Sequence, residues 1–183
     1  MVYQFKVVLI GDGTVGKTTL VKSFMGGEIS DSYKPTLGAD IGKNEIKVDD
    51  EKVILQLWDL SGQSAFEKVR STFYLGAVGA IAVYDVMVDS SYNNILQWLE
   101  EMYAITGKVP VCLVGNKIDL REQSSEGAKT EEDGKLLAKK ISEISNHPTP
   151  FIEASALKNV NSHPPFIDLT RILIKLHPNL VVD

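Results

Sequence analysis

The stretch Gly11-Asp-Gly-Thr-Val-Gly-Lys-Thr18 decides how the rest of the chain is interpreted. Its spacing, a glycine, four residues and then Gly-Lys-Thr, is typical of a loop that binds a run of phosphates. Main-chain N–H groups must approach such an anion closely, which favours glycine, while Lys17 adds a positive charge and Thr18 offers a hydroxyl to Mg²⁺. The apolar run 5–10 predicts a strand before the loop, and residues 19–24 predict a helix after it. A purely structural glycine turn would leave the Lys-Thr pair unexplained.

Strand and helix patterns alternate along all 183 residues, so we expect an α/β protein. The turn chemistry of Asp49-Asp50 predicts an antiparallel hairpin between residues 41–48 and 52–58. The resulting expectation is a mostly parallel six-stranded sheet with one antiparallel edge strand and helices on both faces. Further strands are expected at 77–86, 109–115 and 150–154. Further helices are expected within 59–75, at 90–106, at 130–145, where Thr130-Glu-Glu-Asp133 has the spacing of a capping box, and from Pro164 or Pro165 onward. Trp98 is expected to be a packing residue, and the last helix should bury the apolar stripe Phe166, Leu169, Ile172, Leu173 and Leu176.

Composition excludes several classes of protein. Apolar residues make up 44% of the chain, which is typical of an ordinary globular domain. The net charge of −5 argues against a nucleic-acid-binding surface and gives no support for a basic membrane-binding patch. Cys112 lies in an apolar run, so we expect a buried, inert thiol in a reducing cytosol. We expect neither a signal peptide nor a membrane span, and the C-terminus offers no cysteine for prenylation.

Polar residues follow the predicted strand 52–58, where ligands bind in a sheet of this kind. Asp59 can hold Mg²⁺ directly or through water, although a carboxylate here can also cap a turn. Gly62 allows its N–H to approach a terminal phosphate. Gln63 can orient an attacking water because its amide both donates and accepts, although a glutamine alone indicates nothing.

A second polar stretch, Asn116-Lys-Ile-Asp119, follows the predicted strand 109–115. A carboxylate that accepts two N–H groups from one ring edge selects guanine over adenine. Asn116 can brace the surrounding loops, and the Lys117 stem can lie over the base. After the strand 150–154, the segment Ser155-Ala-Leu157 places a backbone N–H where the guanine carbonyl could accept it.

The polar segment 26–40 predicts a mobile loop. It contains Tyr33-Lys-Pro-Thr36, and the Thr36 hydroxyl could complete the Mg²⁺ shell while its N–H meets a γ-phosphate. We expect such a loop to be ordered by a triphosphate and released after hydrolysis.

Taken in order, these stretches resemble the Ras superfamily of small GTPases, and most of all its Rab branch. The resemblance covers nearly the whole chain and implies the P-loop NTPase (small G-protein) fold. We expect one G domain over residues 1–178 and a short tail, 179–183. The matching segments are Gly11–Thr18, Thr36-Leu-Gly-Ala-Asp40, Leu55-Gln-Leu-Trp-Asp-Leu-Ser-Gly-Gln63, Tyr74-Leu-Gly-Ala77, Val83-Tyr-Asp85, Gly115-Asn-Lys-Ile-Asp119 and Glu153-Ala-Ser-Ala156.

The resemblance also implies residue roles. Catalysis falls to Gln63, Lys17 and Thr36, and Mg²⁺ to Thr18, Thr36 and Asp59. Nucleotide binding falls to Gly13, Thr14, Val15, Gly16, Lys17, Thr18, Thr19, Tyr33, Thr36, Gly62, Asn116, Lys117, Asp119, Ser155, Ala156 and Leu157.

This chain departs from the family pattern at several positions near these residues. Ile29 stands where an aromatic residue usually flanks the guanine, which would loosen the nucleotide. Ser61, Ser64 and Leu157 replace the usual alanine, acidic residue and lysine.

The leading hypothesis is a monomeric molecular switch that hydrolyses GTP to GDP and acts in signalling or vesicle trafficking. Activators, exchange factors and effectors would bind the loops around Thr36 and Gln63. The location would be cytoplasmic or peripheral to a membrane, reached indirectly or through an anchor missing here. The alternative is a non-switching, nucleotide-bound interaction module with degenerate activity. A small-molecule kinase would need an arginine-rich lid and would leave residues 116–119 unused.

Overall fold

The computed structural model describes residues 2–27, 38–62, 67–121 and 127–182. Tyr33, Thr36 and Gln63, as well as Ile29 and Ser64, lie outside the described residues. The elements, in chain order, are β1 (Val2–Ile10), α1 (Lys17–Phe24), β2 (Ala39–Val48), β3 (Glu51–Leu60), α2 (Glu67–Tyr74), β4 (Gly79–Asp85), α3 (Asp89–Asn93), α4 (Ile95–Thr106), β5 (Val111–Asn116), α5 (Ile118–Arg121), α6 (Glu131–Ser145), β6 (Phe151–Ala154), α7 (Pro164–Leu176) and β7 (Val181–Val182).

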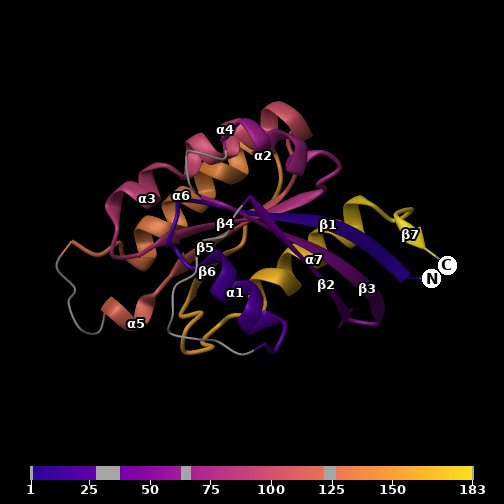
Figure 1. Cartoon of the computed structure of the whole chain (residues 1–183), viewed down its shortest axis with the longest axis horizontal. Helices are drawn as coiled ribbons and strands as arrows, with labels where there is room; N and C mark the ends of the chain where they lie inside the picture. Colours follow the sequence, from indigo (N-terminus) through magenta and orange to yellow (C-terminus); the bar gives the residue numbers. More distant parts are fainter. Residues whose placement is uncertain (1, 28–37, 63–66, 122–126, 183) are drawn as a thin grey trace.

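One sheet runs through the protein in the order β2-β3-β1-β4-β5-β6 (Figure 1). The pairings β3–β1, β1–β4, β4–β5 and β5–β6 are parallel, and the edge strand β2 is antiparallel to β3. The predicted α/β class, parallel sheet and antiparallel edge strand are therefore confirmed.

The described sheet contains one strand more than the six predicted. Val181 and Val182, expected in a short tail, form β7 and pair antiparallel with Tyr3 and Val2 of β1. Two residues are too few to show alternation, so no sequence pattern indicated this strand. The pairing brings the two ends of the chain side by side (Figure 1).

Helices cover both faces of the sheet, because successive side chains of a strand point to opposite faces. On β1, Phe5, Val7 and Leu9 pack into the core under α1 and α7, whereas Val8 and Ile10 pack into the core under α2, α4 and α6 (Figure 1). Cys112 is fully buried, as expected, and burial raises the pKa of its thiol.

The helix ends follow local chemistry. The predicted capping box opens α6, where the Asp133 N–H donates to Thr130 Oγ1 and the Thr130 N–H donates to Asp133 Oδ2. The predicted helix 90–106 is divided at Asn94 into α3 and α4. Leu176, the last residue of α7, was expected in the core stripe but is 43% exposed. In the described part of the chain we find no helix long and apolar enough to cross a bilayer.

Candidate functional site

The loop between β1 and α1 is shaped so that only glycine fits at its last turn. Gly16 has φ +99°, and a Cβ atom there would overlap the side-chain amide of Asn116. Gly62 is equally restricted, since a Cβ atom would overlap the backbone of Asp12 and Gly13. The segment after β3 therefore lies directly against the loop, and no side chain separates the two backbones at Gly62.

Lys17 is the first residue of α1 and is only 6% exposed. Its Nζ donates to the carbonyl oxygens of Gly11 and Asp12, both at 2.7 Å. Burial lowers the pKa of Lys17 to about 8, although the carboxylates of Asp59 and Asp12 oppose the shift. A cation held among carbonyls at this depth would gain from a bound anion, which is what the phosphate-binding motif predicts.

Thr18 and Asp59 meet beside Lys17. Thr18 Oγ1 donates a hydrogen bond to Asp59 Oδ2, which joins the start of α1 to the end of β3. Asp59 is 2% exposed. A hydroxyl and a carboxylate are oxygen ligands of the kind that Mg²⁺ prefers, so this pair fits the predicted metal site.

Asn116, the last residue of β5, joins the phosphate loop to the loop after β6. Its side-chain amide donates to the Val15 carbonyl at 2.8 Å, and its Oδ1 accepts the Ala156 N–H at 3.0 Å. The predicted bracing role matches these contacts.

Asp119 and Lys117 are each held by one partner. Ser155 Oγ, which is almost fully buried, donates to Asp119 Oδ1. Lys117 has φ +69°, and its Nζ lies 2.7 Å from Asp85 Oδ2. Leu157, also predicted at the site, is 45% exposed and belongs to the same loop as Ser155.

Of the remaining predicted residues, Gly13, Thr14 and Thr19 lie in or directly after the phosphate loop. Val15 is buried in the core under α1. The expectations for Tyr33, Thr36 and Gln63 lie outside the described residues.

Sequence reasoning missed a set of contacts that we call the α2–α4 network: Asp12, Arg70, Tyr74, Trp98 and Glu101. Arg70 of α2 makes a two-pronged ion pair with Glu101 of α4 at 2.8 and 2.9 Å, and Tyr74 also donates to Glu101. The guanidinium lies 4.4 Å from the Trp98 ring centroid. Trp98 was interpreted as a packing residue, but its Nε1 donates to Asp12 Oδ1 at 2.7 Å.

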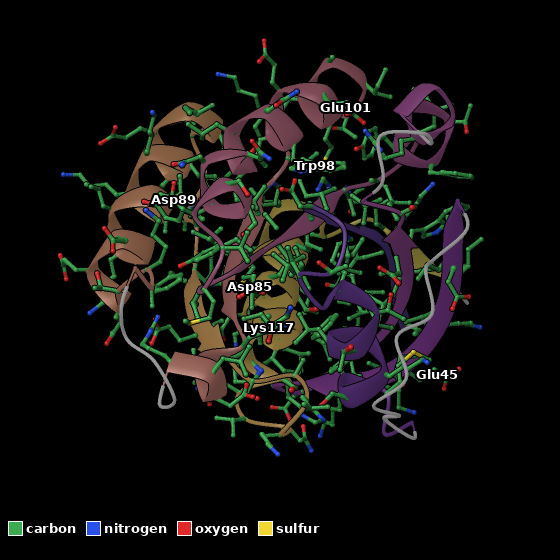
Figure 2. All side chains as sticks on the ribbon, turned by 60° about the vertical axis from the view of Figure 1, so that its left-hand side comes forward. Glu45, Asp85, Asp89, Trp98, Glu101 and Lys117 are labelled. Carbon is green, nitrogen blue, oxygen red and sulfur yellow. The ribbon has the colours of Figure 1, made fainter. Side chains whose placement is uncertain are left out.

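This network connects α2, the helix that follows the segment containing Gln63, to the phosphate loop. Trp98 and Glu101 lie on the same helix, α4 (Figure 2). Asn94 also donates to Asp12, at 2.8 Å. No local pattern could have indicated the link, since Asp12 and Trp98 are 86 positions apart.

Comparison with known proteins identifies the family. A sequence model of the Ras family matches residues 6–175. The chain belongs to the Ras family. Its relatives include the Ras-related protein RABA6b of Arabidopsis thaliana, 38% identical over 183 residues, which cover 99% of this chain and 76% of the relative.

Other members of the Ras family confirm the resemblance to the Rab branch. Ras-related protein Rab-11C of Dictyostelium discoideum is 36% identical over 186 residues, covering 99% of this chain and 79% of the relative. Ras-related protein RIC2 of Oryza sativa subsp. japonica is 40% identical over 172 residues, covering 93% and 75%. The chain is therefore a Rab-like small GTPase of the Ras family.

Proposed function

We propose that the protein binds GTP and GDP with Mg²⁺ and hydrolyses GTP to GDP and phosphate as a molecular switch. The observation that carries this proposal is the double contact of Asn116, which joins Val15 of the phosphate loop to Ala156 of the base-side loop. One side chain thus holds a phosphate site and a base site together, as binding of a nucleotide by its phosphates and its base requires.

The phosphates would be held by backbone N–H groups of residues 13–18, by Lys17 and by the N-terminus of α1. Thr18 and Asp59 would hold Mg²⁺, which when bound supplies charge that neutralises the phosphates. To do so, the Thr18 hydroxyl would turn from donating to Asp59 and offer its lone pairs to the ion.

The base would be read at the other end. Asp119, fixed by Ser155, accepts the two N–H groups on one edge of guanine, and adenine lacks that donor pair. The Lys117 stem covers a face of the ring.

For hydrolysis, Gln63 would orient a water for in-line attack on the γ-phosphorus, and the bond to the β–γ bridging oxygen would break. Thr36 and Gly62 would sense the γ-phosphate and couple its loss to loop shape. Activators, exchange factors and effectors would bind these two loops. We propose a monomer that acts in the cytoplasm or at a membrane surface in signalling or vesicle trafficking.

The test of nucleotide choice is competition for the nucleotide that copurifies with the protein. We expect GTP and GDP to displace it at far lower concentration than ATP, because Asp119 selects guanine. Asp119→Asn should lose this preference, since an amide no longer accepts two N–H groups. Equal displacement by ATP and GTP in the unaltered protein would contradict the proposal.

The test of the switch is single-turnover GTP hydrolysis with and without Mg²⁺. We expect slow, Mg²⁺-dependent phosphate release that Gln63→Leu abolishes while GDP affinity is kept. If no phosphate is released even with an activator, the non-switching interaction module is the better description.

A further inference from the structure

Asp85, the last residue of β4, lies beside the base-recognition stretch but has no role in the assignments above. In the β4–β5 ladder its register partner is Asn116, and Lys117 follows directly. The two oxygens of Asp85 are divided between two partners. Oδ1 accepts the Met87 N–H at 2.9 Å, and Oδ2 pairs with Lys117 Nζ at 2.7 Å (Figure 2).

The Asp85–Lys117 ion pair is less exposed than an ordinary surface pair. The Asp85 side chain is 7% exposed and that of Lys117 is 30% exposed. Solvent therefore screens the two charges less than it screens an exposed pair, and the carboxylate is already fixed by Met87.

The pair also fixes the course of the Lys117 side chain. Lysine has a flexible four-carbon stem whose freedom opposes any single arrangement. Here the stem is anchored at both ends, by a left-handed backbone at its Cα and by Asp85 at its Nζ. Asn116 and Asp119 are fixed in the same way by Ala156 and Ser155.

We propose that Asp85 is a positioning residue for nucleotide binding: it holds the Lys117 stem as a preformed platform for the face of the purine ring. The inference rests on the proposed function. A preformed platform has little ordering entropy left to lose when a base binds, so affinity rises without a new contact between Asp85 and the ligand.

The test uses Asp85→Asn, which keeps the size of the side chain and an oxygen for the Met87 N–H but removes the charge. We expect the dissociation rate of GDP to rise about tenfold, equivalent to ~1.4 kcal/mol of binding. Inosine diphosphate lacks the exocyclic amine that Asp119 reads. It should be affected by the same factor, because the platform contacts the ring face and not its edge.

A double-mutant cycle separates positioning from a structural role. In a Lys117→Met background, Asp85→Asn should change the dissociation rate by less than twofold, because the platform is no longer tied to Asp85. The matched control is Asp89→Asn. Asp89 lies on α3 (Figure 2) and forms an ion pair with Lys129, so this change also removes a charged partner of a lysine. It should leave the dissociation rate of GDP unchanged.

The outcomes are distinct. Equal effects of Asp85→Asn with and without Lys117 would overturn the inference, and so would no effect in either background. If Asp85→Asn does not fold, Asp85→Glu replaces it: the retained charge should keep dissociation within about threefold of the unaltered protein, and a larger loss would count against positioning by charge. Failure of the unaltered protein to bind GDP would instead refute the proposed function itself.

Discussion

The face of the sheet under α1 and α7 differs from the face under α2 and α4 in how it is held. Beneath α1 and α7, the rings of Phe24 and Phe166 stack with centroids 3.9 Å apart and planes at 11°. On the opposite face, the α2–α4 network joins Arg70 and Glu101 to Trp98 and, through it, to the phosphate loop.

The difference indicates that the two faces of the sheet have different roles. Stacked rings lose contact in any other arrangement, so the first face is suited to a permanent scaffold. Ion pairs and hydrogen bonds can exchange partners at modest cost, so the second face is suited to transmitting a change between α2 and the nucleotide. Two experiments test this division, and two more test the phosphate loop at which the network ends.

The largest effect is expected from breaking the scaffold. Phe166→Ala removes half of the stacked pair and should lower the free energy of unfolding by about 3–5 kcal/mol, measured by chemical denaturation. Phe166→Leu should cost much less, because most of the volume is kept. For both variants, the rate of GDP release from the folded fraction should stay within about twofold of the rate of the unaltered protein. This corresponds to a change of ~0.4 kcal/mol or less in GDP binding. Faster release would contradict the assignment of this face as scaffold.

Breaking the network should produce the opposite profile. Glu101→Gln removes the charge that Arg70 faces, and should cost about 1–3 kcal/mol of stability. It should also raise hydrogen exchange in α2 and speed nucleotide release several-fold, because Arg70 no longer clamps Trp98. The control is Glu100→Gln, the same change at the exposed neighbouring residue. If Glu101→Gln alters stability alone, the network does not reach the site.

The pH of the medium tests the loop at which the network ends. The pKa of Lys17 in the ligand-free protein is about 8, and bound phosphate raises it. Above pH 8 the free protein loses this proton, so GDP affinity should fall by up to about tenfold per pH unit.

The free energy of unfolding of the ligand-free protein should rise with pH over the same range. Between about pH 8 and 10.5 the unfolded chain keeps a proton on Lys17 that the folded protein has lost, and the state that binds fewer protons is favoured as the pH rises. Titration calorimetry and denaturation over this range measure both trends. A flat affinity profile would show that Lys17 does not lose its proton in this range.

The smallest effect is expected at Thr14, a β-branched residue with φ +66° and an exposed side chain. Left-handed backbone strains any residue with a Cβ, so Thr14→Gly should stabilise the ligand-free protein by about 1 kcal/mol. The stability of Thr14→Ala should lie between that of the unaltered protein and that of Thr14→Gly. A loss of stability in Thr14→Gly would mean that the loop relies on the side chain and is not strained by it.

The features that could be predicted from the sequence are those that a local pattern of residues encodes. The Gly11–Thr18 spacing, the capping box at Thr130 and the apolar alternation of the strands each depend on residues close in the chain, and the structure agrees with each. The strand-end rule agrees with the positions of two of the predicted site residues: Asp59 is the last residue but one of β3, and Asn116 is the last residue of β5. Asp119 follows in α5.

What could not be predicted depends on partners distant in the chain. Asp85 was visible at a strand end, but its pairing with Lys117 requires the register of β4 against β5. Trp98 was assigned to packing alone, because the residue type does not show where its indole N–H points. Leu176 continued a helical pattern beyond the core it was expected to join.

The pairing of β7 with β1 has a mechanical consequence. Val2 lies opposite Val182 in an antiparallel ladder, so a force that pulls the two ends of the chain apart meets the sheet at this pair first. Such a force breaks the hydrogen bonds of this ladder one after another and does not load many of them at once. The protein should therefore yield to stretching at its ends under low load, with the first extension coming from β7 while β4 and β5 are still intact.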